Sequence, residues 1–190
     1  MLLKYNLRET ARYMGYRRSA EPNEVVRELI EEAYQELLKV IAPKYIYKQY
    51  DFAPTADGIM IEGVEFKSKN LLTHLRDSNA VILFAATLGK GADDLIASYS
   101  KSDVAMAAVA QAVSGSLVEN LCDLAIEEIK IQIKGVFRPR FSPGYGDCSL
   151  SHQTLFFNLL PVNKELSISL TESFMMTPTK TVTAFIGLKK

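Results

Sequence analysis

The stretch Ala80-Val-Ile-Leu-Phe-Ala-Ala86 is an uninterrupted apolar run of the length of one β-strand. A strand with one face in water alternates apolar and polar residues, whereas this run has no polar position. The sequence therefore predicts a strand that is buried on both faces.

The segments before this run predict helices and then short strands. Asn6-Leu-Arg-Glu9 has the spacing of an N-terminal capping box, and Gly15 can end the helix, which predicts a helix over 6–14. Apolar residues recur every three or four positions over 26–41, which predicts an amphipathic helix that Pro43 closes. Alternating apolar residues around two Gly turns in 44–66 predict short paired strands.

After the apolar run, Ser102 is predicted to cap a long helix that reaches about residue 130. The first half of this helix is rich in Ala, Ser and Gly. We interpret these small residues as a surface for tight helix packing, with close approach of a ligand as the alternative. A further helix is expected to begin near Ser149 or Ser151 and to end before Pro161.

Two alternating segments, 166–170 and 182–188, are predicted to be strands. About eleven residues separate them, which is too few for a crossover helix, so we expect them to pair antiparallel. Helices combined with a mainly antiparallel sheet define the α+β class. We expect one domain over 1–190, with an N-terminal helical segment over 1–43 and an α+β core over 44–190.

Composition limits the possible partners. The chain has 190 residues, 48% of them hydrophobic, with 22 basic and 22 acidic side chains. Nucleic-acid-binding proteins and polybasic membrane-surface proteins carry a basic excess, so neither kind of partner is expected. Cys122 and Cys148 form no CxxC pair, and neither a signal peptide nor an apolar stretch of membrane-spanning length is visible. These features favour a cytoplasmic protein.

Two patterns resemble catalytic or binding motifs without completing them. The segment from Thr87 to Asp94 resembles a nucleotide-binding loop, but Asp94 stands where a dinucleotide fingerprint needs its third glycine, so an ordinary strand-to-helix turn is favoured. Cys148 and His152 could be two metal ligands or a nucleophilic pair. No further residue completes either site, and we favour a structural cysteine with a surface histidine.

The most informative segment is Arg138-Pro-Arg140-Phe-Ser-Pro143-Gly144-Tyr145-Gly146-Asp147. It lies within a Gly- and Pro-rich stretch, 135–149, that is expected to be a loop, and we expect residues 138–147 at the mouth of a cleft. Arginine matches a carboxylate with two hydrogen bonds, glycine exposes backbone amides, and a tyrosine ring can stack on a base or lie over a cation. A ligand that combines carboxylate, cation and purine, such as S-adenosylmethionine, suits these groups. The alternative is a Pro-Gly turn with no ligand.

At this segment the sequence resembles the S-adenosylmethionine-binding activation domain of cobalamin-dependent methionine synthase. The shared residues are Arg140, Gly144 and Tyr145, followed by Leu170-Thr-Glu-Ser-Phe-Met-Met-Thr-Pro178 and a strand rich in Thr and Val. The segment from Leu7 to Tyr16 is similar to separate, short members of this family. The resemblance covers most of the chain and is strongest over 102–188.

The resemblance implies an accessory subunit that binds S-adenosylmethionine and presents its methyl group to cobalamin on a partner methionine synthase or related corrinoid protein. An electron, often from a flavodoxin, would accompany this reductive methylation. The domain would position the ligand rather than supply an acid, a base or a nucleophile, so no catalytic residue is expected. The pattern Asp-x-His-x-x-Gly, which ligates cobalt, is absent, so cobalamin is expected only on the partner.

By resemblance, Arg140 pairs with the ligand carboxylate, Ser142 contributes backbone contacts, and Gly144 and Tyr145 line the site. A glutamate of the family falls at Gly115, which makes Glu119, one turn later, the substitute candidate. A second position that is acidic in the family is occupied by Lys134 in this chain, and a position that is tyrosine in the family is occupied by Ile186.

Each of these residues also has a structural interpretation. Arg140 could cap a helix or pair with Asp147, and Tyr145 could serve packing alone. Glu119 could belong to a solvated face with Asp123 and Glu127. The Met175-Met176 pair is interpreted as core.

Three functions remain open at this point. The first is the ligand-binding accessory subunit, and the second is a scaffold of the same fold that docks on a corrinoid protein without binding S-adenosylmethionine. The third is a free-standing methyltransferase, for which no base or acceptor pocket is visible.

Overall fold

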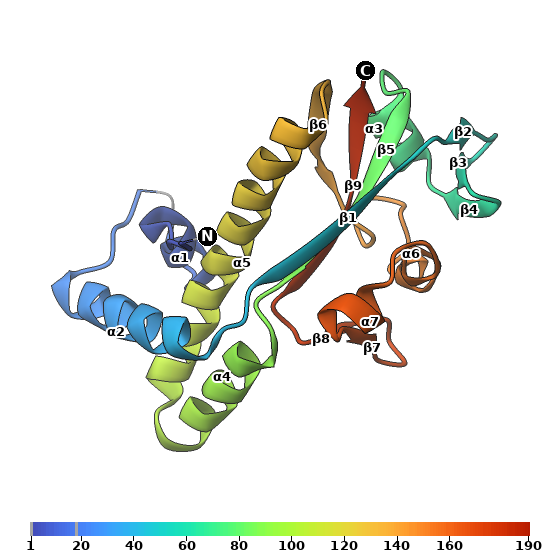
Figure 1. Cartoon of the computed structure of the whole chain (residues 1–190). Coiled ribbons are helices and arrows are strands. Elements are labelled where there is room, and N and C mark those ends of the chain that lie inside the picture. Colours follow the sequence, from blue (N-terminus) through green and yellow to red (C-terminus); the bar gives the residue numbers. More distant parts are fainter. Residues whose placement is uncertain (1, 18) are drawn as a thin grey trace.

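Strand β5 (Ala80–Thr87) lies at the centre of the molecule, and every one of its residues is buried. The computed structural model describes residues 2–17 and 19–190 (Figure 1). Since every residue of β5 is buried, the predicted burial of both faces of this strand is confirmed.

The main sheet has four strands in the order β1-β5-β9-β6. β1 (Lys44–Tyr50) and β9 (Thr181–Lys189) flank β5, and β6 (Val136–Phe141) pairs with the outer side of β9. Each of these pairs is antiparallel. The α+β class with a mainly antiparallel sheet is thus confirmed.

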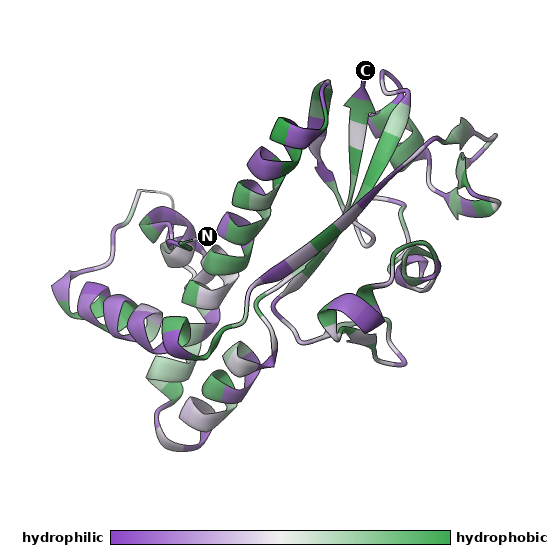
Figure 2. Cartoon of the chain, viewed as in Figure 1, coloured by the Kyte–Doolittle hydropathy of each residue, from purple (hydrophilic) through white to green (hydrophobic). Residues whose placement is uncertain are grey.

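The side chains of β5 alternate between two hydrophobic cores, one on each face of the sheet. Phe84 belongs to the first core and Leu83 to the second. The strand carries no polar alternation because helices cover both of its faces, and its hydropathy is high along its length (Figure 2).

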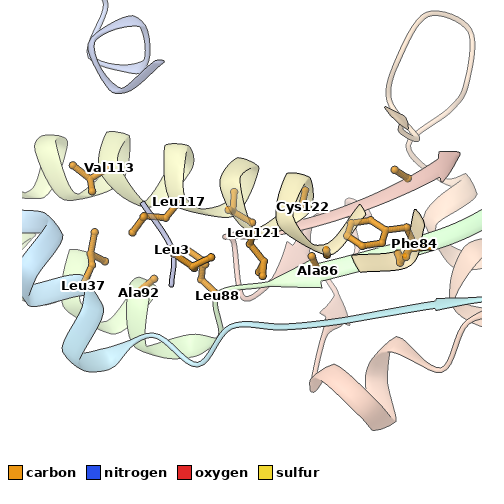
Figure 3. Packing of buried hydrophobic residues seen from close by; sticks show 14 of the residues in the cluster. Leu3, Leu37, Phe84, Ala86, Leu88, Ala92, Val113, Leu117, Leu121 and Cys122 are labelled. Carbon is orange, nitrogen blue, oxygen red and sulfur yellow. The ribbon is translucent and has the colours of Figure 1, made fainter. Parts of the chain in front are cut away.

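Three helices form the layer over the first face: α2 (Glu24–Val40), α4 (Lys90–Ser102) and α5 (Val104–Gln132). Leu37, Ala92 and Leu117 of these helices pack in one cluster with Phe84 of the sheet (Figure 3). The short helix α1 (Leu7–Tyr13) packs against α5.

Smaller elements cover the second face, where Phe66, Leu71 and Phe156 are fully buried. The elements around this core are β2 (Ala53–Pro54), β3 (Gly58–Ile61), β4 (Val64–Lys67), α3 (Lys69–Leu75), α6 (His152–Leu159) and α7 (Val162–Leu166). The strands predicted within 44–66 are present, with β3 and β4 as an antiparallel hairpin and β1 paired with β5.

Among the described residues, α5 is the one helix whose length and composition would allow it to cross a membrane. However, 61% of its most apolar window is buried inside the molecule. Its apolar character serves the core between the sheet and the surrounding helices.

The sequence located one N-terminal cap correctly and misplaced another, and Ser151 at the start of α6 makes no side-chain cap hydrogen bond. Asn6 caps α1 as predicted, with its side chain accepting a hydrogen bond from the Glu9 amide. The predicted cap of α5, Ser102, is instead the last residue of α4. Asp103 caps α5, because its carboxylate accepts a hydrogen bond of 2.9 Å from the Met106 amide.

The predicted pairing of 166–170 with 182–188 is wrong. Leu166 ends helix α7, and the short strand β7 (Ser169–Leu170) pairs with β8 (Met176–Thr177). The Thr171 amide donates to the Met175 carbonyl, and the Met175 amide donates to the Thr171 hydroxyl, so the hairpin is closed locally. β9 is therefore free to pair with β5 and β6.

The stretch 135–149 is also only partly a loop, because β6 occupies its first half. The register of β6 against β9 shifts between Phe137 and Arg140. Pro139 lies within this shift, where its missing N–H costs no ladder hydrogen bond, and β6 is an edge strand that tolerates it.

Candidate functional site

An open groove lies beside the start of β9, between α5 and the segment that follows β6. Three adjoining hollows of about 250, 260 and 360 Å³ form this groove. Glu119 on α5 and Val182 on β9 line all three, so they mark the junction of the groove.

Arg140 lines the hollow of about 260 Å³ together with Glu119, Ser142 and Tyr145. Its Nη2 atom donates to Glu119 Oε2 at 2.8 Å and to Asp123 Oδ1 at 3.0 Å. Its Nη1 atom is buried and has no hydrogen-bond partner among the described residues. Burial opposes the charge of Arg140, but Cys122 and the two carboxylates raise its pKa above the usual value, so the guanidinium stays charged.

These contacts correct two interpretations of the sequence. Arg140 lies in strand β6 rather than in an open loop, and it does not pair with Asp147. Glu119 is half-buried and bound to Arg140, so it is not simply part of a solvated face with Asp123.

Asp147 instead fastens the segment after β6 to helix α3. Its carboxylate accepts hydrogen bonds from the Ser68 hydroxyl and from the amides of Lys69 and Asn70, the last two at 2.8 and 3.2 Å. These hydrogen bonds, that of Ser68 first, lower the pKa of Asp147. The anchored carboxylate fixes one end of the segment that carries Ser142 and Tyr145.

The other predicted site residues take different positions. Ser142 and Tyr145 line the groove, and the Tyr145 side chain is 59% exposed, so it is not packing alone. Gly144 is exposed and does not line the hollows. It adopts φ 95°, and its amide donates to the Cys148 carbonyl at 2.7 Å, so it shapes the turn that presents Tyr145.

The three positions at which this chain departs from the family pattern lie in different surroundings. Gly115 lines the hollow of about 360 Å³, where the ring of Tyr13 lies against it. Lys134 is exposed beyond the end of α5 and lines none of the three hollows, and Ile186 is buried in β9. Glu119 is therefore the carboxylate that the structure places at the junction of the groove.

Sequence reasoning noted the segment Leu170–Pro178 as shared with the family but did not assign it to the ligand site. Phe174, Met175 and Met176 line the far wall of the groove together with Thr179, Thr181, Val182 and Thr183. Met175 is 57% exposed, so its assignment to the core was wrong. Tyr13 was also missed. It lies in a short N-terminal helix, and nothing in the sequence of that helix indicates contact with groove residues that follow about a hundred positions later in the chain.

Cys148 and His152 are both buried, which corrects the expected surface position of the histidine. The Cys148 Sγ atom lies 3.4 Å from Nδ1 of His152. Burial raises the pKa of the thiol to about 11 and lowers that of the imidazole, which is the opposite of a thiolate–imidazolium pair. No cluster of three His, Cys, Asp or Glu side chains suited to a metal ion occurs in residues 2–17 and 19–190.

The fold and the groove together define an α+β domain with a groove that is lined by groups of both charges. A half-buried arginine and a carboxylate lie 2.8 Å apart, and exposed aromatic and apolar side chains surround them.

Comparison with known proteins gives the family. A family model described as "Vitamin B12 dependent methionine synthase, activation domain" matches residues 72–190, and the chain belongs to this family. A structure titled "Crystal Structure of the MetH Reactivation Domain bound to AdoHcy" matches with a TM-score of 0.69 and 18% sequence identity. The match covers 96% of this chain and 74% of that one, and it shows the shared fold. No curated protein sequence matches.

Proposed function

We propose that this protein binds S-adenosylmethionine in the groove and supports reductive methylation of cobalamin on a partner, a methionine synthase or a related corrinoid methyltransferase. The observation that carries the proposal is the position of Arg140, Ser142 and Tyr145 on one groove in a chain of the activation-domain family. The similar domain whose printed title names bound AdoHcy supports a ligand of this chemical class.

The Arg140–Glu119 ion pair suggests how the ligand is held. The amino-acid end of S-adenosylmethionine carries a carboxylate and an ammonium. In our proposal the ligand carboxylate accepts hydrogen bonds from Arg140, and the ligand ammonium donates hydrogen bonds to Glu119. Two ion pairs with the ligand thus replace the one ion pair between Arg140 and Glu119. Since Asp123 also contacts Arg140, the guanidinium keeps its orientation during this exchange.

The groove residues would bind and orient the methyl donor, and the reaction would need no acid or base from this chain. Ser142 and the turn at Gly144 would hold the nucleoside near Tyr145. The partner's corrin would supply the nucleophile once one electron, from a flavodoxin-type donor, has reduced its cobalt from Co(II) to Co(I). The methyl group would then pass from the sulfonium to cobalt as the sulfur–methyl bond breaks, and S-adenosylhomocysteine would remain in the groove.

The proposed setting is the cytoplasm. Both cysteines are buried and unpaired, which is compatible with a reducing compartment. Cobalamin would enter only with the partner protein, and neither nucleic acid nor a membrane is part of the proposal.

The test is calorimetric titration of S-adenosylmethionine into the parent protein and into Arg140→Ala and Arg140→Lys. Loss of charged hydrogen bonds of about 1.5–3 kcal/mol predicts roughly 10- to 150-fold weaker binding for Arg140→Ala. Lysine should restore little, because a point charge cannot replace the planar fork.

Arg138→Ala is the matched control. Arg138 lies two residues earlier on β6 and pairs with Asp77, and it lines none of the groove hollows. Its removal should leave binding unchanged. Parental affinity in Arg140→Ala would exclude Arg140 as a ligand contact.

A second candidate function is a scaffold that docks on a corrinoid protein without binding S-adenosylmethionine. The engagement of Arg140 by two carboxylates and the glycine at position 115 favour it. Repeating the titration with a cobalamin protein present separates the two functions. A scaffold would bind the cobalamin protein, but titration with S-adenosylmethionine would release no binding heat, whether or not that protein is present.

A further inference from the structure

Helix α1 contributes a wall to the groove through Tyr13. This residue lines the hollow of about 360 Å³, which also contains Gln111, Gly115, Glu119 and Lys180. The hollow joins the Arg140 region through Glu119 and Val182. Tyr13 lies outside residues 72–190, so this wall is not part of the segment that the family model matches.

Specific contacts fix α1 on α5 and so determine where Tyr13 lies. The Asn6 amide donates to Ser116 Oγ at 2.8 Å, and the Lys4 amide donates to Asn120 Oδ1 at 2.8 Å. Thr10 and Ala11 of α1 are buried. The small residues of α5 at this level therefore serve tight helix packing, as the sequence suggested.

Gly115 makes room for the Tyr13 ring. A Cβ atom at position 115 would lie 3.2 Å from Cδ2 and 3.3 Å from Cε2 of that ring, which is tighter than ordinary van der Waals contact. The guanidinium of Arg12 lies 4.8 Å from the ring centroid. The ring thus lies against Gly115 and Arg12, while the Tyr13 side chain as a whole remains 43% exposed at the groove.

The Tyr13 hydroxyl has no hydrogen-bond partner among residues 2–17 and 19–190. Burial, and then the negative charge of Glu119, raise the pKa of Tyr13, so the hydroxyl remains protonated at neutral pH. A neutral phenol both donates and accepts a hydrogen bond.

We propose that Tyr13 is a ligand-contacting residue, whose hydroxyl forms a hydrogen bond with a polar group of the bound S-adenosylmethionine beside Glu119. This inference rests on the proposed function and extends its site to helix α1. Gly115 then acts as a positioning residue, because its missing side chain lets the phenol reach the groove.

The experiment is calorimetric titration of S-adenosylmethionine into the parent protein, Tyr13→Phe, Tyr13→Ala and Arg140→Ala. Tyr13→Phe keeps the ring on Gly115 and removes only the hydroxyl. The loss of one ordinary hydrogen bond predicts roughly 2- to 12-fold weaker binding. Tyr13→Ala should weaken binding at least as much.

Tyr16→Phe is the matched control, since Tyr16 lines a separate hollow between α1 and α2 and should leave affinity unchanged. Gly115→Ala provides a test of coupling. It should weaken binding in the parent background and have little further effect in the Tyr13→Ala background, because it acts through the displaced ring.

The outcomes separate this inference from the proposed function. Parental affinity in Tyr13→Phe, with weakened binding in Arg140→Ala, would overturn the hydrogen bond from Tyr13 and leave the proposed function standing, whatever Tyr13→Ala does. A parent protein that binds no S-adenosylmethionine, alone or with a cobalamin protein, would overturn both.

Discussion

Asp147 shows how one carboxylate joins the groove to the rest of the fold. It binds the start of α3 through Ser68 and two backbone amides, and these contacts favour its ionised form. Because its pKa is lower in the folded than in the unfolded chain, its stabilisation is fully present above the unfolded pKa of about 4. The stabilisation is lost as the pH falls through the folded pKa.

We therefore expect Asp147→Ala to melt at a lower temperature than the parent at pH 7. The difference should shrink toward zero as the pH falls below about 4, as followed by circular dichroism melts across pH. Asp51→Ala, an exposed carboxylate without an ion pair among the described residues, is the control. A melting difference that persists undiminished at low pH would contradict this role of the ionised Asp147 carboxylate.

The two cysteines give a second prediction. Burial raises the pKa of Cys122 to about 12 and that of Cys148 to about 11, so neither thiol ionises appreciably at neutral pH. Iodoacetamide at pH 7.5 should label neither cysteine in the folded protein and both in denaturant, as counted by mass spectrometry. Rapid labelling of the folded protein would show that a thiol is more accessible than the structure indicates.

Sequence reasoning at the residue scale found the groove residues that carry a motif. Arg140 and Tyr145 stand in a recognisable spacing, so they could be named without a structure. The sequence did not predict which carboxylates pair with Arg140, because the contact between Arg140 and Glu119 depends on how α5 crosses the end of β6. Tyr13 carries no motif at all, and only the packing of α1 on Gly115 brings it to the groove.

At the scale of elements, helix α5 can be tested at its N-terminus. Asp103→Ala should lower the free energy of unfolding by about 1 kcal/mol, because it removes the side-chain acceptor for the Met106 amide. Ser102→Ala should cost much less, since that hydroxyl lies 3.4 Å from the Ser98 carbonyl and caps nothing. Urea unfolding measures both, and the reverse order would restore Ser102 as the cap.

The strands show where local patterns stop being informative. Periodicity located the apolar strand β5 and the last strand β9 within a few residues. It assigned β9 the wrong neighbour, because a short connection suggests local pairing while the actual partner, β5, lies about a hundred residues earlier. The pairing and register of distant strands depend on which strand faces the helices can cover, and the sequence of one strand does not contain this information.

At the scale of the molecule, the groove combines segments from the whole chain. α1, α5, the end of β6 and the start of β9 each supply a wall. The same elements pack on one sheet, and Leu3 near the N-terminus is buried in the same core as Phe84 and Leu188. We propose on this basis that residues 1–190 fold as one domain.

This proposal predicts one cooperative unfolding transition that responds to changes in distant places. Phe84→Ala on one face of β5, Leu83→Ala on the other face and Leu3→Ala near the N-terminus should each cost about 2–5 kcal/mol. For a chain of this size, each kcal/mol lowers the melting temperature by roughly 2–4 °C. Calorimetry should show a single peak that moves in all three variants, with equal calorimetric and van't Hoff enthalpies.

If Leu3→Ala instead splits off a separate early transition while the main peak stays in place, the N-terminal helical segment over 1–43 is an independent unit. Its wall of the groove would then form only when that segment docks on α5.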